Sequence, residues 1–192
     1  MTRILLIANV VVYFLMQTAP ADVLRTFALW PIGSGLFMPW QLATYAFLHG
    51  GLTHLAFNMY GLWMFGTELE RVWGPRRLCI FYAASVLAAA VAQLAVTGWL
   101  GSMAPTVGAS GGLFGLMLGF AYVFPRRKIM LLIPPIPLPA PWFVALYGAL
   151  ELTLGISGSA TGIAHFAHLG GLVGGWLVLR YWSGQIPFGA RR

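Results

Sequence analysis

Charge is scarce in this chain of 192 residues, because Asp, Glu, Lys and Arg together make up only 8% of it. Soluble domains carry about 25% charged residues, whereas hydrophobic residues here reach 59%. A single globule of this size cannot hide so much apolar surface from water. The composition therefore excludes a soluble enzyme and a disordered chain.

Cysteine is nearly absent, and Cys79 alone cannot form a disulfide within the chain, which excludes a secreted disulfide scaffold. Acidic residues are also few, since 4 Asp and Glu face 11 Lys and Arg, for a net charge of +7. A basic balance is typical of proteins that bind nucleic acid or anionic lipid. Here the charges lie between long apolar runs, so we expect a lipid bilayer and no nucleic acid as partner.

Six apolar segments are predicted to span the membrane as helices, each needing about 20 residues. They cover about residues 4–16, 52–65, 78–96, 108–124, 141–156 and 163–181. The sequence thus predicts one all-α domain over residues 1–192, a bundle of six transmembrane helices with a long loop over about 17–51. Five prolines in residues 133–141 predict an irregular approach to the fifth span.

The basic residues indicate how the bundle is oriented. Ten of the eleven lie at connections that share one side of an alternating six-span bundle, and Arg25 is the exception. Lys and Arg favour the cytoplasmic side, so both termini are expected there and the long first loop outside. With no targeting presequence, we expect a multi-pass protein of a prokaryotic plasma membrane. Alternatively, Ala19-Pro20-Ala21 after an apolar run fits a cleaved signal peptide.

Ser110 is a functional candidate, because polar residues within spans are costly to insert. It lies between Gly108 and Gly111 at the outer start of the fourth predicted span. Gly111, Gly115 and Gly119 form a smooth stripe along which another helix can approach closely. Free backbone N–H groups at a helix start could stabilise an oxyanion there. The same residues also fit a packing seam with an incidental serine.

A second glycine face lies in the sixth predicted span. His168, Gly171 and Gly175 share one side of a helix by their three- and four-residue spacing. If this face meets the glycine stripe of the fourth span, His168 can reach Ser110 and serve as its base.

The second predicted span carries two further polar candidates. His54 and Asn58 are four residues apart and so share a face, and both can donate hydrogen bonds towards an oxyanion. His49 is about half a turn out of phase with them and is expected in the preceding loop.

The same residues resemble two other kinds of site. The serine segment matches G-x-S-x-G, but that nucleophile elbow needs a strand–turn–helix, and this chain predicts no strands. His165 and His168 could share a metal ion, yet no carboxylate is placed to complete a hydrolytic zinc site. We therefore expect no metal and no cofactor.

The sequence leaves the roles of Glu151 and His165 undetermined. Glu151 lies about a third of the way in from the outer end of the fifth span. It fits a structural hydrogen-bonding group, or a group that tunes the base or lines a substrate gate. His165 is expected to be structural or gating, because the glycine pattern belongs to His168.

Taken together, three of these segments resemble the rhomboid family of intramembrane serine proteases. Gly108-Ala109-Ser110-Gly111 matches one catalytic motif, and Ala167-His168 followed by Gly171 and Gly175 matches the other. His49, His54 and Asn58 match the family pattern H-x4-H-x3-N, and the resemblance covers about residues 40–181.

The resemblance implies a catalytic site without cofactor or metal. Ser110 would be the nucleophile and His168 its general base. His54, the Asn58 side chain and the Ser110 backbone N–H would form the oxyanion hole. Phe114 would pack on the catalytic histidine. Implied substrates are transmembrane proteins, cut near the outer ends of their helices through an acyl-enzyme.

The resemblance also concerns the first loop. Glu70 and Gly74 match a family pattern that anchors this loop. Trp40 matches the tryptophan of a Trp-Arg pair, but Gln41 replaces the arginine, which leaves the anchoring of the loop open.

Two other classes of protein remain open. A catalytically inactive relative that binds and escorts membrane proteins would have lost the serine or the histidine, and this chain keeps both. A small transporter or channel would place polar groups at the membrane midplane and usually contain a repeat. Here the polar groups cluster near the outer face and no repeat is visible. The pattern predicts no particular oligomeric state.

Overall fold

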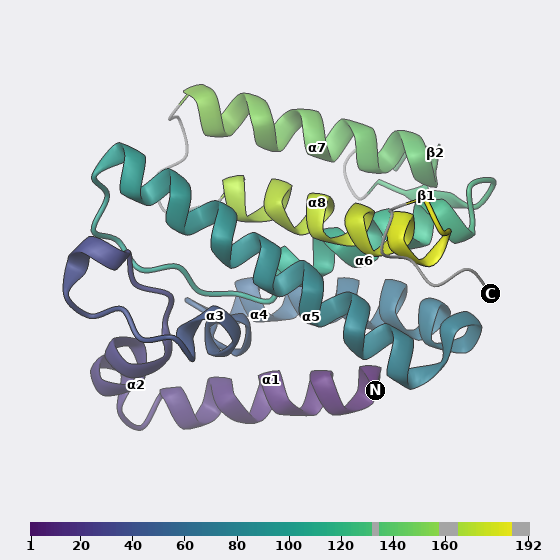
Figure 1. Cartoon of the computed structure of the whole chain (residues 1–192). Coiled ribbons are helices and arrows are strands. Elements are labelled where there is room, and N and C mark those ends of the chain that lie inside the picture. The colour runs from purple at the N-terminus through teal and green to yellow at the C-terminus, as the bar shows by residue number, and fades with distance from the viewer. Residues whose placement is uncertain (132–134, 158–164, 186–192) are drawn as a thin grey trace.

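The computed structural model describes residues 1–131, 135–157 and 165–185, most of which are helical. In Figure 1, α8 (His165–Trp182) runs through the middle of the bundle, between α1 (Thr2–Met16) and α7 (Ala140–Ser157). α8 packs mainly against α5 (Thr67–Leu100) and α6 (Ser110–Val123). The predicted helical character of the domain is confirmed.

Helices occupy all six predicted spans within the described residues. The second span is covered by α4 (Leu52–Gly61) and a π-helical turn over Leu62–Gly66. The others correspond to α1, α5, α6, α7 and α8, and residues 163 and 164 of the sixth prediction lie outside the described ranges. By length and composition, only Leu52–Leu100 and Ala140–Ser157 among the described helices could each cross a membrane alone. The six-span count and the side of the termini therefore stay predictions.

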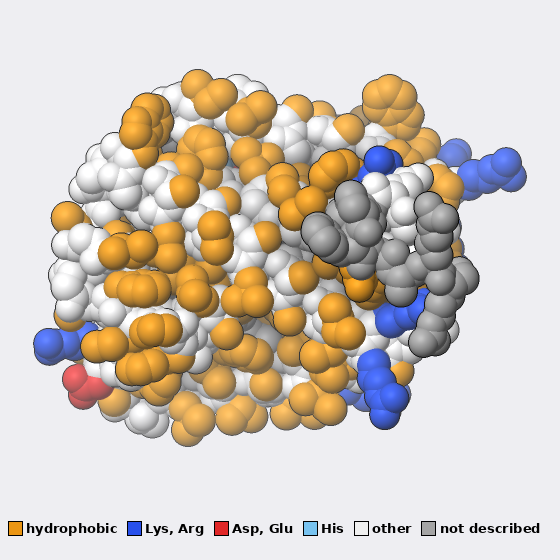
Figure 2. Space-filling view, in the orientation of Figure 1, with side chains coloured by type: hydrophobic (Ala, Val, Ile, Leu, Met, Phe, Trp, Pro, Cys, Tyr) orange, Lys and Arg blue, Asp and Glu red, His pale blue; other side chains and the backbone are white. Residues whose placement is uncertain are grey.

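The surface of the bundle is largely apolar. Figure 2 shows hydrophobic side chains over most of one face, with most Lys and Arg side chains near one end. Large hydrophobic residues such as Trp99 and Ile156 are exposed by 84% and 74%. Contiguous apolar surface of this extent suits contact with lipid rather than with water.

A break at Gly74 separates the second and third predicted spans. Gly74 has φ +76° inside α5 and is followed by Pro75, and a left-handed backbone of this kind favours glycine. One turn earlier, the Glu70 carboxylate pairs with the Met1 ammonium and accepts a 2.9 Å hydrogen bond from Thr2 N. Glu70 thus anchors the start of α1. The expectation that it anchors the first loop is wrong, because α1 begins at this end of the bundle while the loop follows its far end.

Two short strands lie between α6 and α7, where the sequence predicts none. β1 (Lys128–Met130) pairs antiparallel with β2 (Pro137–Pro139), so that Ile129 lies opposite Leu138. Prolines lack an N–H donor, but a two-stranded ribbon has only edges, where proline is tolerated. The expected irregular approach to the fifth span is therefore wrong for residues 137–139, and residues 132–134 lie outside the described ranges.

The long first loop contains short helical segments. It contains α2 (Pro20–Phe27), α3 (Gln41–Thr44) and 3-10 turns at Ile32–Ser34 and Tyr45–Phe47. Together these cover one end of the bundle (Figure 1).

Gln41 holds this loop together. Its side chain is fully buried and donates to Thr26 O at 3.2 Å and to Leu36 O at 3.0 Å. Its Oε1 accepts from Trp30 N at 3.2 Å, and Trp40 Nε1 donates to Thr26 O at 2.9 Å. A neutral amide can both donate and accept, which a guanidinium cannot. Gln41 therefore anchors the loop by hydrogen bonds of its own.

Replacing Gln41 by alanine should destabilise the protein, because buried backbone groups of the loop would lose their partners. We expect the free energy of unfolding to fall by about 1–3 kcal/mol, measured by thermal unfolding in detergent. Gln17→Ala is the matched control, since that exposed side chain only donates to Tyr13 O on its own helix. Equal stability of the two variants would contradict this role.

Glycines bring the backbones of α6 and α8 into contact, as the two stripes predict. A Cβ at Gly171 would lie 1.9 Å from Gly111 O, and one at Gly175 would lie 3.2 Å from Gly115 Cα. Gly119 does not share this seam, since a Cβ there would meet Trp73 and Phe81 instead. Small residues are what allow such close helix approach within a membrane.

Gly171→Ala should therefore destabilise the bundle, because its new methyl group meets backbone atoms that cannot rotate away. We expect a loss of about 1–3 kcal/mol in the free energy of unfolding, typical of overpacking. Gly98→Ala is the matched control, since nothing lies within 4 Å of the added Cβ on α5. A Gly171→Ala protein with the thermal midpoint of Gly98→Ala would refute the tight seam.

Candidate active site

The first loop holds the segment that precedes Ser110. Leu29 and Thr106 exchange two backbone hydrogen bonds of 3.0 and 2.9 Å, and Gly108 N donates to Tyr45 O at 3.0 Å. The Tyr45 hydroxyl in turn donates to Val86 O on α5 at 2.9 Å. These bonds fix the chain just before the serine.

Gly108 is required by its conformation and its neighbour. Its φ is +129°, and a Cβ there would lie 2.9 Å from the His54 ring. The chain then turns into α6, which begins at Ser110 as the fourth predicted span suggested. Backbone N–H groups in a first helical turn have no partner within the helix, so they are free to meet a substrate oxygen.

Ser110 and His168 meet across the glycine seam. The Ser110 Oγ lies 2.7 Å from Nε2 of His168, which is on α8. Phe114, one turn after Ser110, stacks on the His168 ring with centroids 4.4 Å apart and planes 7° apart. The predicted packing of Phe114 on this histidine is confirmed. A hydroxyl in hydrogen-bond contact with a neutral imidazole can be activated as a nucleophile.

His54 and Asn58 lie on α4 and face the same space as Ser110. All three line a cavity of about 750 Å³, together with His168. Asn58 Nδ2 donates to His54 O at 2.9 Å, and its buried Oδ1 has no partner within the described part of the chain. An amide NH2 has two N–H donors, so one of them is left for an oxygen in the cavity. Both side chains are thus within the cavity where an oxyanion would form.

The cavity lies at the loop end of the bundle. Its wall includes Gly50 before α4 and loop residues 102 and 104–107 before α6. A second cavity of about 600 Å³ adjoins it and is lined mostly by apolar side chains, with charged side chains of α5 and of residues 127–128 also in its wall. The two share Phe57, Leu113 and Glu151. A polar chamber and an apolar one therefore meet beside the Ser110–His168 pair.

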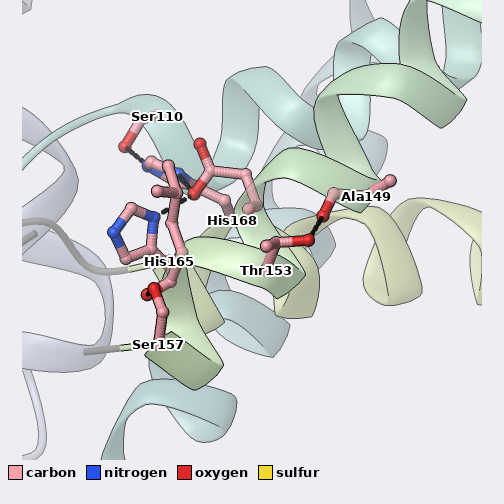
Figure 3. Close-up of polar contacts among 8 residues, drawn as sticks. Ser110, Ala149, Thr153, Ser157, His165 and His168 are labelled. Carbon is pink, nitrogen blue, oxygen red and sulfur yellow. Dashed lines mark hydrogen bonds and ion pairs between the residues drawn. The ribbon is translucent and has the colours of Figure 1, made fainter. Parts of the chain in front are cut away.

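Glu151 joins this group from α7, which the sequence left undetermined. Its Oε2 lies 2.5 Å from His165 Nδ1 and 3.0 Å from His168 Nδ1. A carboxylate thus lies beside both histidines of α8, a neighbour that the sequence pattern did not predict. No group of three or more His, Cys, Asp or Glu side chains in the described residues has an arrangement that could hold a metal ion. Figure 3 shows His165 and His168 with Ser110, between α6, α7 and α8.

His49 lies in the loop before α4, as expected, and is almost fully buried. Its ring packs edge-on against His54, with centroids 5.0 Å apart and planes 68° apart. Burial, with a smaller contribution from His54, lowers the pKa of His49 from 6.5 to about 4. The ring is therefore neutral at pH 7 and supports His54 by packing.

The lowered pKa of His49 predicts a pH dependence of stability. The unfolded chain takes up a proton near pH 6.5 and the folded protein only near pH 4, so protonation favours unfolding. The stability from His49 is complete above pH 6.5 and is lost as the pH falls towards 4. We expect wild type to lose about 1–2 kcal/mol more than His49→Gln between pH 7 and pH 5. Unfolding midpoints of both proteins across this range test it, and parallel curves would contradict it.

Comparison with known proteins gives a consistent result. Residues 36–184 match the rhomboid domain. The chain is 33% identical to the rhomboid protease GlpG of Serratia proteamaculans over 91% of its own length and 59% of that relative. It is 31% identical to the rhomboid protease GluP of Bacillus subtilis over 71% of the chain and 25% of the relative. It is 35% identical to the mitochondrial rhomboid protein 1 of Saccharomyces cerevisiae over 69% of the chain and 38% of the relative.

The chain thus spans between a quarter and three fifths of the length of these relatives. The matched region contains all three motif segments, from His49 in the loop before α4 to Gly175 in α8. On this match the chain belongs to the rhomboid family.

Proposed function

We propose that the protein is an intramembrane serine endopeptidase that cleaves transmembrane proteins near the outer ends of their helices. The observation that carries this proposal is the 2.7 Å contact between Ser110 Oγ and His168 Nε2, at the wall of a cavity lined in part by loop residues. The relatives named rhomboid proteases support the same activity. Ser110 is the nucleophile and His168 the general base.

In the first step, His168 Nε2 takes the Ser110 hydroxyl proton while Oγ bonds to the peptide carbonyl carbon. The carbonyl π electrons move to oxygen, and His54, Asn58 and the Ser110 backbone N–H donate to this oxyanion. Each such donor contributes about 3–4 kcal/mol to the transition state in serine proteases. The carbonyl re-forms as the C–N bond breaks, and His168 returns the proton to the leaving amine.

In the second step, water attacks the acyl-enzyme with His168 again as the base, and Ser110 leaves with the proton. Water must therefore reach the serine within a membrane protein. The polar cavity supports such access, because residues of two loops form part of its wall. The proposed reaction needs no metal or cofactor, because His168 transfers the proton and the side-chain and backbone donors bind the oxyanion.

The second, apolar cavity supports a membrane-embedded substrate. It lies between α4 and α7 and contacts the polar cavity at Phe57, Leu113 and Glu151. An apolar segment lying there would present its loop-side end to Ser110. The distribution of basic residues supports a multi-pass plasma-membrane protein whose cavity faces the outside.

Cleavage of a single-span reporter protein in liposomes tests the proposal. We expect wild type to cut it, and Ser110→Ala and His168→Ala to lose at least about 1,000-fold in kcat/KM, as in other serine proteases. Ser183→Ala is the matched control, because this exposed serine only donates to Arg180 O at the end of α8. A fluorophosphonate should label wild type at Ser110 and leave Ser110→Ala unlabelled.

Two results would overturn the proposal. Cleavage that survives Ser110→Ala would exclude this serine as the nucleophile. Absence of both cleavage and labelling in folded wild type would favour the non-catalytic escort class instead.

A further inference from the structure

The far nitrogen of the proposed base lies beside a buried carboxylate. His168 Nδ1 is 3.0 Å from Glu151 Oε2, close enough for an ion pair but without the geometry of a hydrogen bond, and Nδ1 has no hydrogen-bond partner among the described residues. Glu151 is only 9% exposed, on a helix that otherwise carries apolar and small polar side chains. A buried carboxylate is costly unless it is paired, so its neighbours indicate what it serves.

The tautomer of His168 connects this carboxylate to the serine. To accept the Ser110 proton, Nε2 must be unprotonated, which places the proton of the neutral ring on Nδ1. That proton then lies on the side of the ring near the Glu151 carboxylate, whose Oε2 is 3.0 Å from Nδ1. The opposite tautomer would place a lone pair against a negative oxygen and remove the base from Ser110. The carboxylate thus favours the one tautomer that can act.

His165 offers a competing explanation for the carboxylate. Its Nδ1 lies 2.5 Å from the same Oε2, and both residues are buried. This contact joins α7 to α8 and could account for Glu151 as a purely structural bond. The two explanations differ in whether the charge of Glu151 acts on the reaction or only on the packing of α7.

We propose that Glu151 is a positioning residue for His168, so that Ser110, His168 and Glu151 act as a Ser–His–Glu group. This rests on the proposed protease function and adds to it the part played by α7. Glu151 holds the imidazole with its Nδ1 proton towards α7 and its Nε2 towards Ser110. When Nε2 takes the serine proton, the carboxylate stabilises the positive ring, while the proton itself passes from Ser110 Oγ to the leaving amine. Glu151 exchanges no proton in this sequence.

The test compares Glu151→Gln with wild type on the same reporter in liposomes. Glutamine keeps the shape and removes the charge, so we expect kcat to fall by roughly 10- to 1,000-fold, below the ~10⁴-fold loss on amide replacement of a buried triad carboxylate. KM should stay near its wild-type value, because Glu151 acts on His168 and not on the bound substrate. The rate of fluorophosphonate labelling of Ser110 should fall with kcat, since labelling reports serine activation without a peptide.

Thr153→Ala is the matched control on α7. Figure 3 shows the Thr153 side chain directed towards Ala149 and away from the Ser110–His168 pair. The Thr153 hydroxyl donates a 2.8 Å hydrogen bond to Ala149 O. We expect wild-type kcat and labelling for this variant. Glu151→Asp, which keeps the charge on a shorter side chain, should restore part of the kcat lost in Glu151→Gln.

His165→Gln separates the two explanations. If the α7–α8 bond alone matters, Glu151→Gln and His165→Gln lose the same activity and thermal stability, and the double variant loses no more. Our proposal instead predicts a much larger kcat loss for Glu151→Gln. If Glu151→Gln does not fold, the kcat, KM and labelling rate of Glu151→Asp are compared with those of wild type and His165→Gln instead.

Three outcomes would overturn the positioning role: wild-type kcat in folded Glu151→Gln, a loss confined to KM, or equal losses in Glu151→Gln and His165→Gln. None of these outcomes contradicts the proposed protease function, provided that wild type cleaves the reporter and Ser110→Ala does not. Failure of wild type to cleave would remove both proposals together.

Discussion

The contact between the backbones of α6 and α8 at Gly111 and Gly171 is the constraint on which the site depends. Ser110 and His168 are 58 residues apart in the chain, yet their side chains meet at 2.7 Å. A serine hydroxyl is short, so its helix must approach the histidine helix closely. A methyl group at Gly171 would lie 1.9 Å from Gly111 O, and the helices would have to separate to admit it. The glycines therefore act in packing, and the dyad geometry is its consequence.

The loop end of the bundle shows the same dependence of chemistry on packing. Ser110 begins a helix whose preceding turn is bonded to Tyr45 and Leu29 of the first loop. That loop is held in turn by the buried amide of Gln41. In surroundings this poor in charge, a neutral side chain that satisfies three backbone groups avoids the cost of desolvating a guanidinium. The position of the serine is thus set by the loop as well as by the helix seam.

The sequence predicted those contacts that are made by residues repeating at helical spacing. The glycine stripes predicted the α6–α8 seam, and the resemblance to the rhomboid family implied the stacking of Phe114 on His168. They could not give the direction of Glu151, because a uniformly apolar helix leaves its rotation about its own axis undefined. The partners of Glu70 and Gln41 were missed for another reason, since they lie on separate segments and follow no period. The strand at residues 137–139 was not predicted, because its prolines argue against a strand.

The placement of the four acidic residues shows why Glu151 differs from the others. Glu68 pairs with Arg71 and Arg127, whose guanidinium groups keep their positive charge, and Glu70 pairs with the Met1 ammonium. Asp22 lies in the first turn of α2. Glu151 alone faces histidines, whose charge depends on where a proton resides. A carboxylate placed only for stability would gain more from a permanent cation, as Glu68 does. Beside a histidine that acts as the proposed base, a fixed negative charge would favour the charged imidazole during proton transfer without being consumed.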